Sequence, residues 1–342
     1  MKTHGHIFEK FSSQDNLHLA YINARRGKSW QSRVRAVDRN AVSMLEELRT
    51  SILDGTYRTS PYRLKWIHEP KDRLIYILPF YPDRIAQHAV IQVLGPIWDR
   101  LFISDSYACR VGKGQHQASL RCMEFARKNR YCLQCDIHKF YPSISHEVLA
   151  GIIRRKLKDR RMLRFLDEII YSGGPDGINV PIGNYTSQWF GNLYLNEVDQ
   201  LCKHVFKIHC YERYCDDFLL FSDDKAKLRD CAQTITDFCG EKLRLTLSKC
   251  SLFPTAQGVD FVGYRHFQNG KILVRKRTVK KIKADIKAVP WKLRHGLLTK
   301  DSARSVIDSA LGVLKHAETY NLRKAMGIDQ LREEVVGDAQ VF

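Results

Sequence analysis

The sequence predicts a mixed α+β fold built from more than one part. The chain has 342 residues, and at about 150 residues per domain this length corresponds to roughly two domains or one large enzyme. Apolar residues make up 44% of the chain, which is enough for a sizeable core and excludes global disorder. Segments with helical periodicity and short apolar strand segments both occur, and no internal repeat is visible.

Periodicity in the first part of the chain predicts three helices and a pair of strands. Val37–Leu53 has an apolar stripe at helical spacing and ends at Asp54-Gly55. The other expected elements are strands at Leu64–Ile67 and Leu74–Leu78 around a turn at 69–72, and helices at Pro82–Leu94 and Gln115–Lys128.

The later part predicts a buried strand, two helices and a hairpin. A loop rich in glycine at 173–177 separates the two helices, and Thr186-Ser187-Gln188 can cap the second. These elements are a strand at Leu133–Ile137, helices at His146–Lys158 and Thr186–His204, and a hairpin at Tyr211–Phe221. After Tyr264 the composition shifts, which indicates a boundary before a basic helical tail.

The charge balance indicates a phosphate-rich partner. There are 56 Lys and Arg residues against 37 Asp and Glu residues, a formal net charge of +19, which is typical of proteins that bind nucleic acid. Seven of the cations lie between Lys271 and Lys283, and a second basic cluster runs from Arg154 to Arg164. Either run alone can be a solvated face, but two separated basic surfaces favour a duplex held from two sides.

We expect a cytoplasmic protein with reduced thiols and no membrane partner. Met1 to Ser13 contains no apolar core of signal-peptide length, and no later stretch approaches the roughly 18 apolar residues of a membrane span. The one Cys-x-x-Cys, Cys132 to Cys135, lies in a predicted strand, where odd spacing places the two thiols on opposite faces. We therefore interpret them as buried small side chains rather than as a zinc or redox motif.

Three carboxylates carry the predicted chemistry. Asp136 follows a buried strand, and Asp216 and Asp217 occupy the tip of an apolar hairpin. Adjacent acids repel each other unless a cation neutralises them, and two Mg²⁺ ions about 3.5 to 4 Å apart do so in enzymes that run in-line displacement at phosphorus. An ordinary acidic turn explains Asp216 and Asp217 alone, but Asp136 upstream favours a metal-dependent nucleotidyl transferase.

Six segments resemble the motifs of reverse transcriptases. Tyr214-Cys215-Asp216-Asp217 is similar to the Tyr-x-Asp-Asp box of that family, and Cys135–Ile144 resembles its first catalytic-aspartate motif. The other four similar segments are Pro70–Ile75, Arg84–Ala89, Val180–Tyr194 and Gly258–Tyr264, so the resemblance covers roughly residues 60 to 265. It implies a right-hand polymerase with fingers, a palm and a short helical thumb, which copies RNA into DNA.

The resemblance also implies where these parts begin and end. The tail after Tyr264 is long enough for a thumb but hardly for an added nuclease domain. We expect fingers at 1–110, the first part of the palm at 111–145, a fingers insertion at 146–180, the second part of the palm at 181–264, and the thumb at 265–342.

One departure from most bacterial reverse transcriptases indicates a branch of the family. Those enzymes have Gln in a Pro-Gln-Gly triplet and end the motif in Ser-Pro, whereas this chain has Ile182 followed later by Ser187-Gln188. With Tyr107–Gly114 upstream, this resembles the reverse transcriptases of diversity-generating retroelements, which copy a template-repeat RNA into cDNA with errors at adenines. Alternatives are a defence-type enzyme of the abortive-infection kind and a retron-like or group II intron-like enzyme; a noncatalytic RNA-binding scaffold has no need to keep all three aspartates.

The resemblance assigns expected roles to individual residues. The metal ligands would be Asp136, Asp216, Asp217 and the carbonyl of Ile137, with Mg²⁺ as the ion and Mn²⁺ as a substitute. The incoming dNTP would meet Lys71, Arg73, Tyr141, Ile182 and Gly183, with Tyr141 as the steric gate against a ribose 2′-hydroxyl. Template and primer would contact Ser187, Gln188, Asn192, Gly263, Tyr264, Arg275, Lys276 and Arg277. Lys249 would protonate the leaving pyrophosphate.

Plainer interpretations of these residues remain open. Lys71 and Arg73 can be solvated charges, Tyr141 can be packed core, and Ile182 can simply pack. Our hypothesis is that Ile182 offers shape without hydrogen bonds at the nascent pair and so lowers fidelity. The expected partners are template RNA, the cDNA/RNA duplex, dNTPs and, from the resemblance, a small accessory protein that forms a helical-bundle pentamer.

Overall fold

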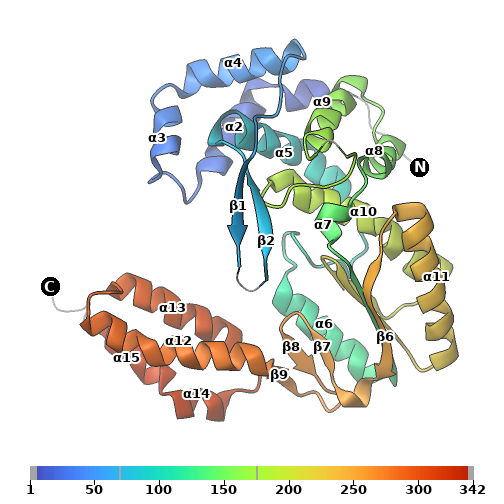
Figure 1. Ribbon diagram of the computed structural model, residues 1–342, viewed down its shortest axis with the longest axis vertical. Coiled ribbons are helices and arrows are strands. Elements are labelled where there is room, and N and C mark those ends of the chain that lie inside the picture. Colours follow the sequence, from blue (N-terminus) through green and yellow to red (C-terminus); the bar gives the residue numbers. More distant parts are fainter. Residues whose placement is uncertain (1–5, 69–70, 175, 338–342) are drawn as a thin grey trace. The chain divides into compact units, whose positions relative to one another are not determined.

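The computed structural model describes residues 6–68, 71–174 and 176–337 (Figure 1). The chain forms two compact units whose segments interleave along the sequence. The first unit contains the chain up to Arg110, Cys135–Lys207 and Asp230–Cys250, and the second contains Val111–Gln134, Ile208–Arg229 and the chain from Ser251 onward. Within the described part, no helix is both long enough and apolar enough to cross a bilayer.

The amino-terminal helices of the first unit pack through apolar faces and a few polar links. They are α1 (Phe8–Phe11), α2 (Gln14–Arg25), α3 (Ser32–Asp38), α4 (Ala41–Leu53), the short helical segment η1 (Phe80–Arg84) and α5 (Ile85–Asp99). Ser13 caps α2 by accepting a hydrogen bond from the Asn16 N–H, and the Asn16 amide donates to Ala89 on α5. The helix predicted to begin at Val37 begins at Ala41, because the backbone of Asn40 is not helical.

A two-stranded antiparallel sheet follows α4. Strands β1 (Arg63–Ile67) and β2 (Arg73–Ile77) pair with Lys65 opposite Ile75, which confirms the predicted strand pair. Positions 69 and 70 of the predicted turn lie outside the described residues.

Two of the other helices of the first unit begin at a polar side chain that caps them. The other helices are α7 (Phe140–Ser143), α8 (His146–Lys156), α9 (Arg160–Tyr171), α10 (Tyr185–Gln200), the short segment η2 (Leu201–Val205) and most of α11 (Lys225–Leu243). Ser145 caps α8 and Asp159 caps α9. The Asp159 carboxylate also accepts from the N–H groups of Ile7 and Phe8 at 2.7 and 2.8 Å, which fastens α1 to α9. Position 175 of the predicted glycine-rich loop is outside the described residues.

A four-stranded sheet carries the predicted catalytic hairpin. Its strands are β3 (Tyr131–Ile137), β4 (Tyr211–Tyr214), β5 (Asp217–Ser222) and β6 (Leu247–Pro254), in the order β4-β5-β3-β6. Tyr214 lies opposite Asp217 at the hairpin end, and Cys215 in the turn has a φ of 55°, a left-handed value. The predicted strand and hairpin are thus confirmed.

The second unit combines α6 (Gln115–Lys128), a three-stranded sheet and a helical region. The sheet contains β7 (Val259–Phe261), β8 (Tyr264–His266) and β9 (Ile272–Val274), and the short segment η3 (Thr255–Gln257) precedes it. The helices are α12 (Lys276–Arg294), α13 (Lys300–Leu314), α14 (Tyr320–Met326) and α15 (Ile328–Gly337). Tyr264, Ile282, Ile307 and Leu311 belong to one buried apolar cluster. The basic tail is therefore helical only from Lys276, because β8 and β9 first complete the small sheet.

Candidate active site

A buried glutamine orients Asp217 in the second unit. The side-chain amide of Gln134 on β3 donates to the two carboxylate oxygens of Asp217 at 3.1 and 3.4 Å, and to the backbone carbonyl of Asp260 at 3.0 Å. Arg213, also buried, donates to the carbonyl of Cys215 at 3.0 Å and so supports the turn before Asp216. The side chains of Gln134 and Arg213 thus hold the hairpin tip by hydrogen bonds, which limits the directions that its carboxylates can take.

Asp136 is supported in the first unit from strand β6. The Ser248 hydroxyl donates to the Asp136 carboxylate at 2.5 Å, and the His138 N–H donates to the Thr246 carbonyl at 2.8 Å. Asp136 is half-buried, whereas its neighbour Ile137 is fully buried. Since alternate side chains of a strand share a face, Gln134 and Asp136 leave β3 on the same side.

One of the points where the chain passes from one unit to the other falls between Gln134 and Cys135. Asp136 thus belongs to one unit, and Asp216 and Asp217 belong to the other. Within the described residues, no three or more His, Cys, Asp or Glu side chains form a group that could hold a metal ion. The carboxylate oxygens are the donors that hard divalent cations prefer, and the expected metal ligands stay a prediction.

Tyr141 lies over a glycine of α10. A Cβ atom added to Gly191 would lie 3.2 Å from Cε1 of Tyr141 and 3.1 Å from Cε1 of Phe140, so the glycine makes room for both rings. The Tyr141 ring is half-exposed and lies 5.2 Å from the Phe140 ring, centroid to centroid. Its neighbour Phe140 is buried in the core, whereas Tyr141 is only partly buried.

The Ile182-Gly183 loop is docked on strand β2 through backbone atoms. The Tyr76 N–H donates to the Ile182 carbonyl at 2.8 Å. Gly183 has a φ of 116°, and a Cβ there would lie 2.8 Å from the Tyr76 carbonyl oxygen, which only glycine avoids. Lys71 and Arg73, near the start of β2, are both exposed.

Several residues predicted to contact template or primer have internal partners. Ser187 and Asn192 are buried, and their side chains donate to the carbonyls of Pro181 at 2.7 Å and Ala108 at 2.9 Å. Gln188, one turn from Asn192, is exposed. For Ser187 and Asn192 these bonds describe positioning, and contact with nucleic acid stays a prediction.

The residues predicted near the primer lie around β8 and the start of α12. Tyr264 is fully buried, and its hydroxyl donates to the Val313 carbonyl at 3.2 Å. The carbonyl of Gly263 accepts from the Arg275 N–H at 3.2 Å, and the Arg275 guanidinium pairs with Asp260. Two further predicted residues of this group, Lys276 and Arg277, are exposed at the amino end of α12, and Lys249 is exposed on β6.

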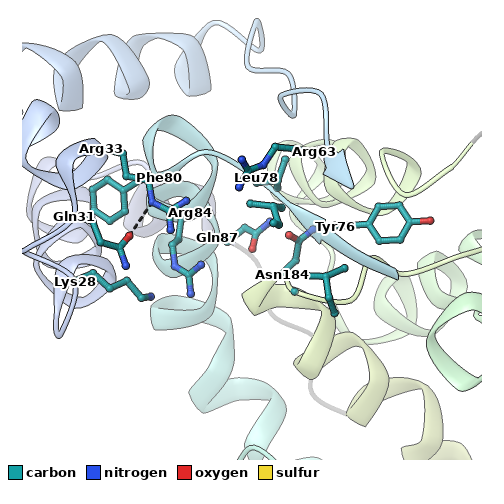
Figure 2. A pocket seen from close by; sticks show the side chains of 13 residues that line it. Lys28, Gln31, Arg33, Arg63, Tyr76, Leu78, Phe80, Arg84, Gln87 and Asn184 are labelled. Atoms are coloured by element: carbon teal, nitrogen blue, oxygen red, sulfur yellow. Dashed lines mark hydrogen bonds between the residues drawn. The ribbon is translucent and has the colours of Figure 1, made fainter. Parts of the chain in front are cut away.

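A basic pocket beside the Ile182-Gly183 loop was not predicted from the sequence. Its volume is about 240 Å³, and Figure 2 shows the side chains around it, which come from the loop after α2, from α3, β1, β2, η1 and α5, and from Asn184 just before α10. None of the described residues that line it is acidic. The polar side chains that line it include Lys28, Arg33, Arg63, Arg84, Gln87 and Asn184.

The cations of this pocket are poorly compensated. Burial lowers the pKa of Arg84, and Arg33 lowers it further. Burial likewise lowers the pKa of Lys28, with Arg84 as the next cause. The buried Nε of Arg84 has no hydrogen-bond partner within the described chain. Positive charge held at this density favours an anion in the pocket.

Part of the second predicted basic cluster is neutralised within the protein. Arg154 pairs with Asp167 at 2.6 Å and Arg155 with Glu197 at 2.7 Å. The Arg161 guanidinium lies 3.9 Å from the centroid of the Phe8 ring. These three cations are engaged in the fold of the first unit, so they contribute less to a nucleic-acid surface than the sequence suggested.

The mixed helix and sheet architecture, with a strand hairpin in a four-stranded sheet, is that of a polymerase of the right-hand class. Residues 69–266 match the family model described as "Reverse transcriptase (RNA-dependent DNA polymerase)". The chain belongs to the reverse transcriptase family and is an RNA-directed DNA polymerase. This membership confirms the predicted α+β right-hand fold, and enzymes of this family generally use divalent metal ions and bind template RNA.

Relatives place the chain among bacterial and intron-encoded proteins. Protein YkfC of Escherichia coli (strain K12) is 26% identical over 286 residues, covering 68% of this chain and 72% of the relative. The group II intron-encoded protein LtrA of Lactococcus lactis subsp. cremoris is 26% identical over 165 residues, covering 46% of this chain and 28% of LtrA. The solved telomerase of Candida albicans, in complex with a TWJ fragment of telomeric RNA, has a TM-score of 0.49 and 13% identity, covering 82% of this chain and 60% of that chain.

Proposed function

We propose that the chain copies an RNA template into cDNA in the cytoplasm, using Asp136, Asp216 and Asp217 as the catalytic carboxylates. The observation that carries this is the paired support of Asp217 by Gln134 and of Asp136 by Ser248. The two supporting groups direct oxygen donors without neutralising their charge, which suits carboxylates that bind cations. Two Mg²⁺ ions, replaceable by Mn²⁺, would be held there with the Ile137 carbonyl and would stabilise charge on the transferring phosphoryl group.

The nucleotide would be bound and selected by residues of the first unit. Lys71 and Arg73 would donate charge-assisted hydrogen bonds to triphosphate oxygens. The partly exposed Tyr141 ring would exclude a 2′-hydroxyl, since Gly191 lets the ring lie close to α10. Lys249 would give a proton to the leaving pyrophosphate. The nascent base pair would lie against Ile182 and Gly183.

Template and primer would be held mainly by charge. The pocket cations Lys28, Arg33 and Arg84 would bind a backbone phosphate of the template. Exposed Gln188, which follows the Ile182-Gly183 loop in the sequence, would also contact the template. Ser187 and Asn192 would position the start of α10 near the template. Gly263, Tyr264 and Arg275 would position the backbone near the primer. Lys276 and Arg277 lie at the amino end of α12, where positive side chains are repelled by the positive end of the helix dipole. A phosphate bound there would offset this repulsion. The fingers would comprise residues 1–110 and 146–180, the palm residues 111–145 and 181–264, and the thumb residues 265–342.

The finer proposal is that the cDNA carries errors at template adenines and diversifies a target gene. Ile182 supports it, because an apolar side chain in this loop gives shape but no hydrogen bond to test pairing. The expected partner is a small helical-bundle oligomer that makes the polymerase productive on its own RNA. The relatives favour a second candidate, a group II intron-like enzyme.

Primer extension on a defined RNA, with Mg²⁺ and with the accessory partner added, tests both levels. We expect Asp216→Ala to lose synthesis while RNA binding persists; loss of binding alone, with synthesis per bound complex intact, would contradict the catalytic assignment. Sequencing the cDNA decides the finer level. Adenine errors that fall in Ile182→Gln but persist in the matched apolar variant Ile182→Leu support diversification. Faithful product from the unaltered protein supports the intron-like candidate, and product without RNA supports a defence-type enzyme.

A further inference from the structure

Two cysteines from neighbouring strands approach each other next to the proposed catalytic Asp136. The Sγ atoms of Cys135 on β3 and Cys250 on β6 are 3.7 Å apart, and the two thiols are hydrogen-bonded. The strands run antiparallel, because backbone bonds join Arg130 to Thr255 at one end and His138 to Thr246 at the other. Both cysteines belong to the first unit. The pair is distinct from the sequence pair Cys132 and Cys135, whose thiols leave the strand on opposite faces.

The two thiols differ in exposure in the way a reactive pair requires. Cys250 is exposed and Cys135 is fully buried. A small oxidant can therefore reach Cys250, while Cys135 lies behind it as the second sulfur. The hydrogen bond from Cys135, with help from Thr236 and against the effect of burial, lowers the pKa of Cys250 to about 7. The Cys135 thiol donates this hydrogen bond, so its sulfur faces the sulfur of Cys250.

We propose that Cys135 and Cys250 are an oxidation site, in which a hydroperoxide converts the thiol pair to a disulfide that lowers polymerase activity. The effect on activity rests on the proposed function of Asp136, whereas the formation of the disulfide does not. In a reducing compartment such a bond would be transient, as regulatory disulfides are.

The reaction is balanced with the peroxide as oxidant. The Cys250 thiolate attacks one peroxide oxygen, the O–O bond breaks, and Cys250 becomes a sulfenic acid while an alkoxide or hydroxide leaves. The Cys135 sulfur then attacks the Cys250 sulfur, the S–O bond breaks, and the departing hydroxide takes the Cys135 proton as water. Two thiols and one hydroperoxide thus give one disulfide, one alcohol or water, and one further water.

The bond would disturb Asp136 from both sides. Cys135 directly precedes Asp136 in β3, and Cys250 lies two residues after Ser248, whose hydroxyl bonds to the Asp136 carboxylate. Closing the sulfurs from 3.7 Å to the about 2.05 Å of a disulfide requires β3, β6 or both side chains to move. A misplacement of about 1 Å can reduce catalysis by about 100-fold, so we expect a loss of at least about 10-fold.

The test treats the full-length protein with hydrogen peroxide, blocks remaining thiols, and follows both extension activity and nonreduced peptides. We expect a peptide joining Cys135 to Cys250, about 2 Da lighter than its reduced parts, and a loss of activity that dithiothreitol reverses. Cys250→Ser should keep its activity in peroxide. The matched control Cys109→Ser removes another exposed thiol of the same unit and should respond like the unaltered protein.

The remaining outcomes overturn the proposal in different ways. Absence of the joined peptide would show that the pair does not close. A joined peptide with full activity would refute the inhibitory effect, and equal loss in Cys250→Ser would assign inhibition to another thiol, such as Cys215. If the reduced protein had no polymerase activity, the proposed function would fail with the regulatory effect, and the joined peptide would still decide whether the oxidation site exists. Cys135→Ser removes the second sulfur, so peroxide should give no joined peptide in that variant.

Discussion

Alanine in place of Gly183 tests how the loop is docked on β2. The added Cβ would lie 2.8 Å from the Tyr76 carbonyl and 3.0 Å from Cγ2 of Ile75, at a φ of 116°. The backbone strain of such a conformation costs about 1–3 kcal/mol, and forcing an atom into a packed contact costs about 1–3 kcal/mol more. We expect lower stability and, because Ile182 moves with the loop, a raised KM for dNTPs.

Gly114 offers a matched control for this variant. Its φ is 119°, nearly that of Gly183, but nothing lies within 4 Å of an added Cβ. Gly114→Ala thus carries the strain without the clash. At about 2–4 °C per kcal/mol, Gly183→Ala should melt about 2–12 °C below Gly114→Ala. Thermal unfolding followed by circular dichroism measures the difference, and equal melting temperatures would refute the argument that Tyr76 sets the need for glycine.

Three further predictions concern the supporting groups. Gln134→Leu removes a hydrogen bond to the Asp217 carboxylate and should lower kcat by about 10- to 100-fold with RNA affinity unchanged, as single-turnover extension would reveal. Arg84→Gln should weaken RNA binding and reduce the salt dependence of the binding constant by about one ion, whereas exposed Arg35→Gln should not; equal effects in fluorescence titrations would exclude the pocket. Burial, with Arg84 and Lys28, lowers the pKa of His88 from 6.5 to about 4. Because the unfolded chain binds this proton more readily, the free energy of unfolding is full above about pH 6.5 and decreases as the pH falls toward about 4. His88→Gln removes this group, so its free energy of unfolding should fall less between neutral pH and about pH 5 than that of the unaltered protein. Urea unfolding at the two pH values measures the difference.

Local patterns predicted much of the fold, because they determine elements without reference to distant residues. The helix at Gln115–Lys128 was predicted with its observed bounds, and the hairpin around Cys215-Asp216-Asp217 follows from two apolar strands flanking a turn. The start of the helix at Ala41 could not be read from periodicity, since Val37 continues the apolar pattern while belonging to α3. The backbone break at Asn40 interrupts a pattern that the apolar residues alone would extend.

The catalytic carboxylates could be identified from the sequence, but their supports could not. Gln134 could have been noticed because it shares a face of β3 with Asp136. Ser248 has no such signal, since its role depends on the pairing of β6 with β3, more than 100 residues apart in the chain. Burial of Ser187 and Tyr264 was equally hidden, because a polar side chain can be buried wherever a carbonyl receives its hydroxyl, and the sequence does not show where that carbonyl lies.

The interleaved composition of the two units has a consequence for synthesis on the ribosome. The first unit needs Asp230–Cys250 as well as the chain up to Arg110, so its early helices must wait for a segment made much later. The second unit begins at Val111 and requires the chain beyond Ser251. Neither unit is a continuous piece that can be completed before the other has begun. Contacts between such distant segments slow folding, and the early apolar helices are exposed while they wait, which makes nascent chains a target for chaperones.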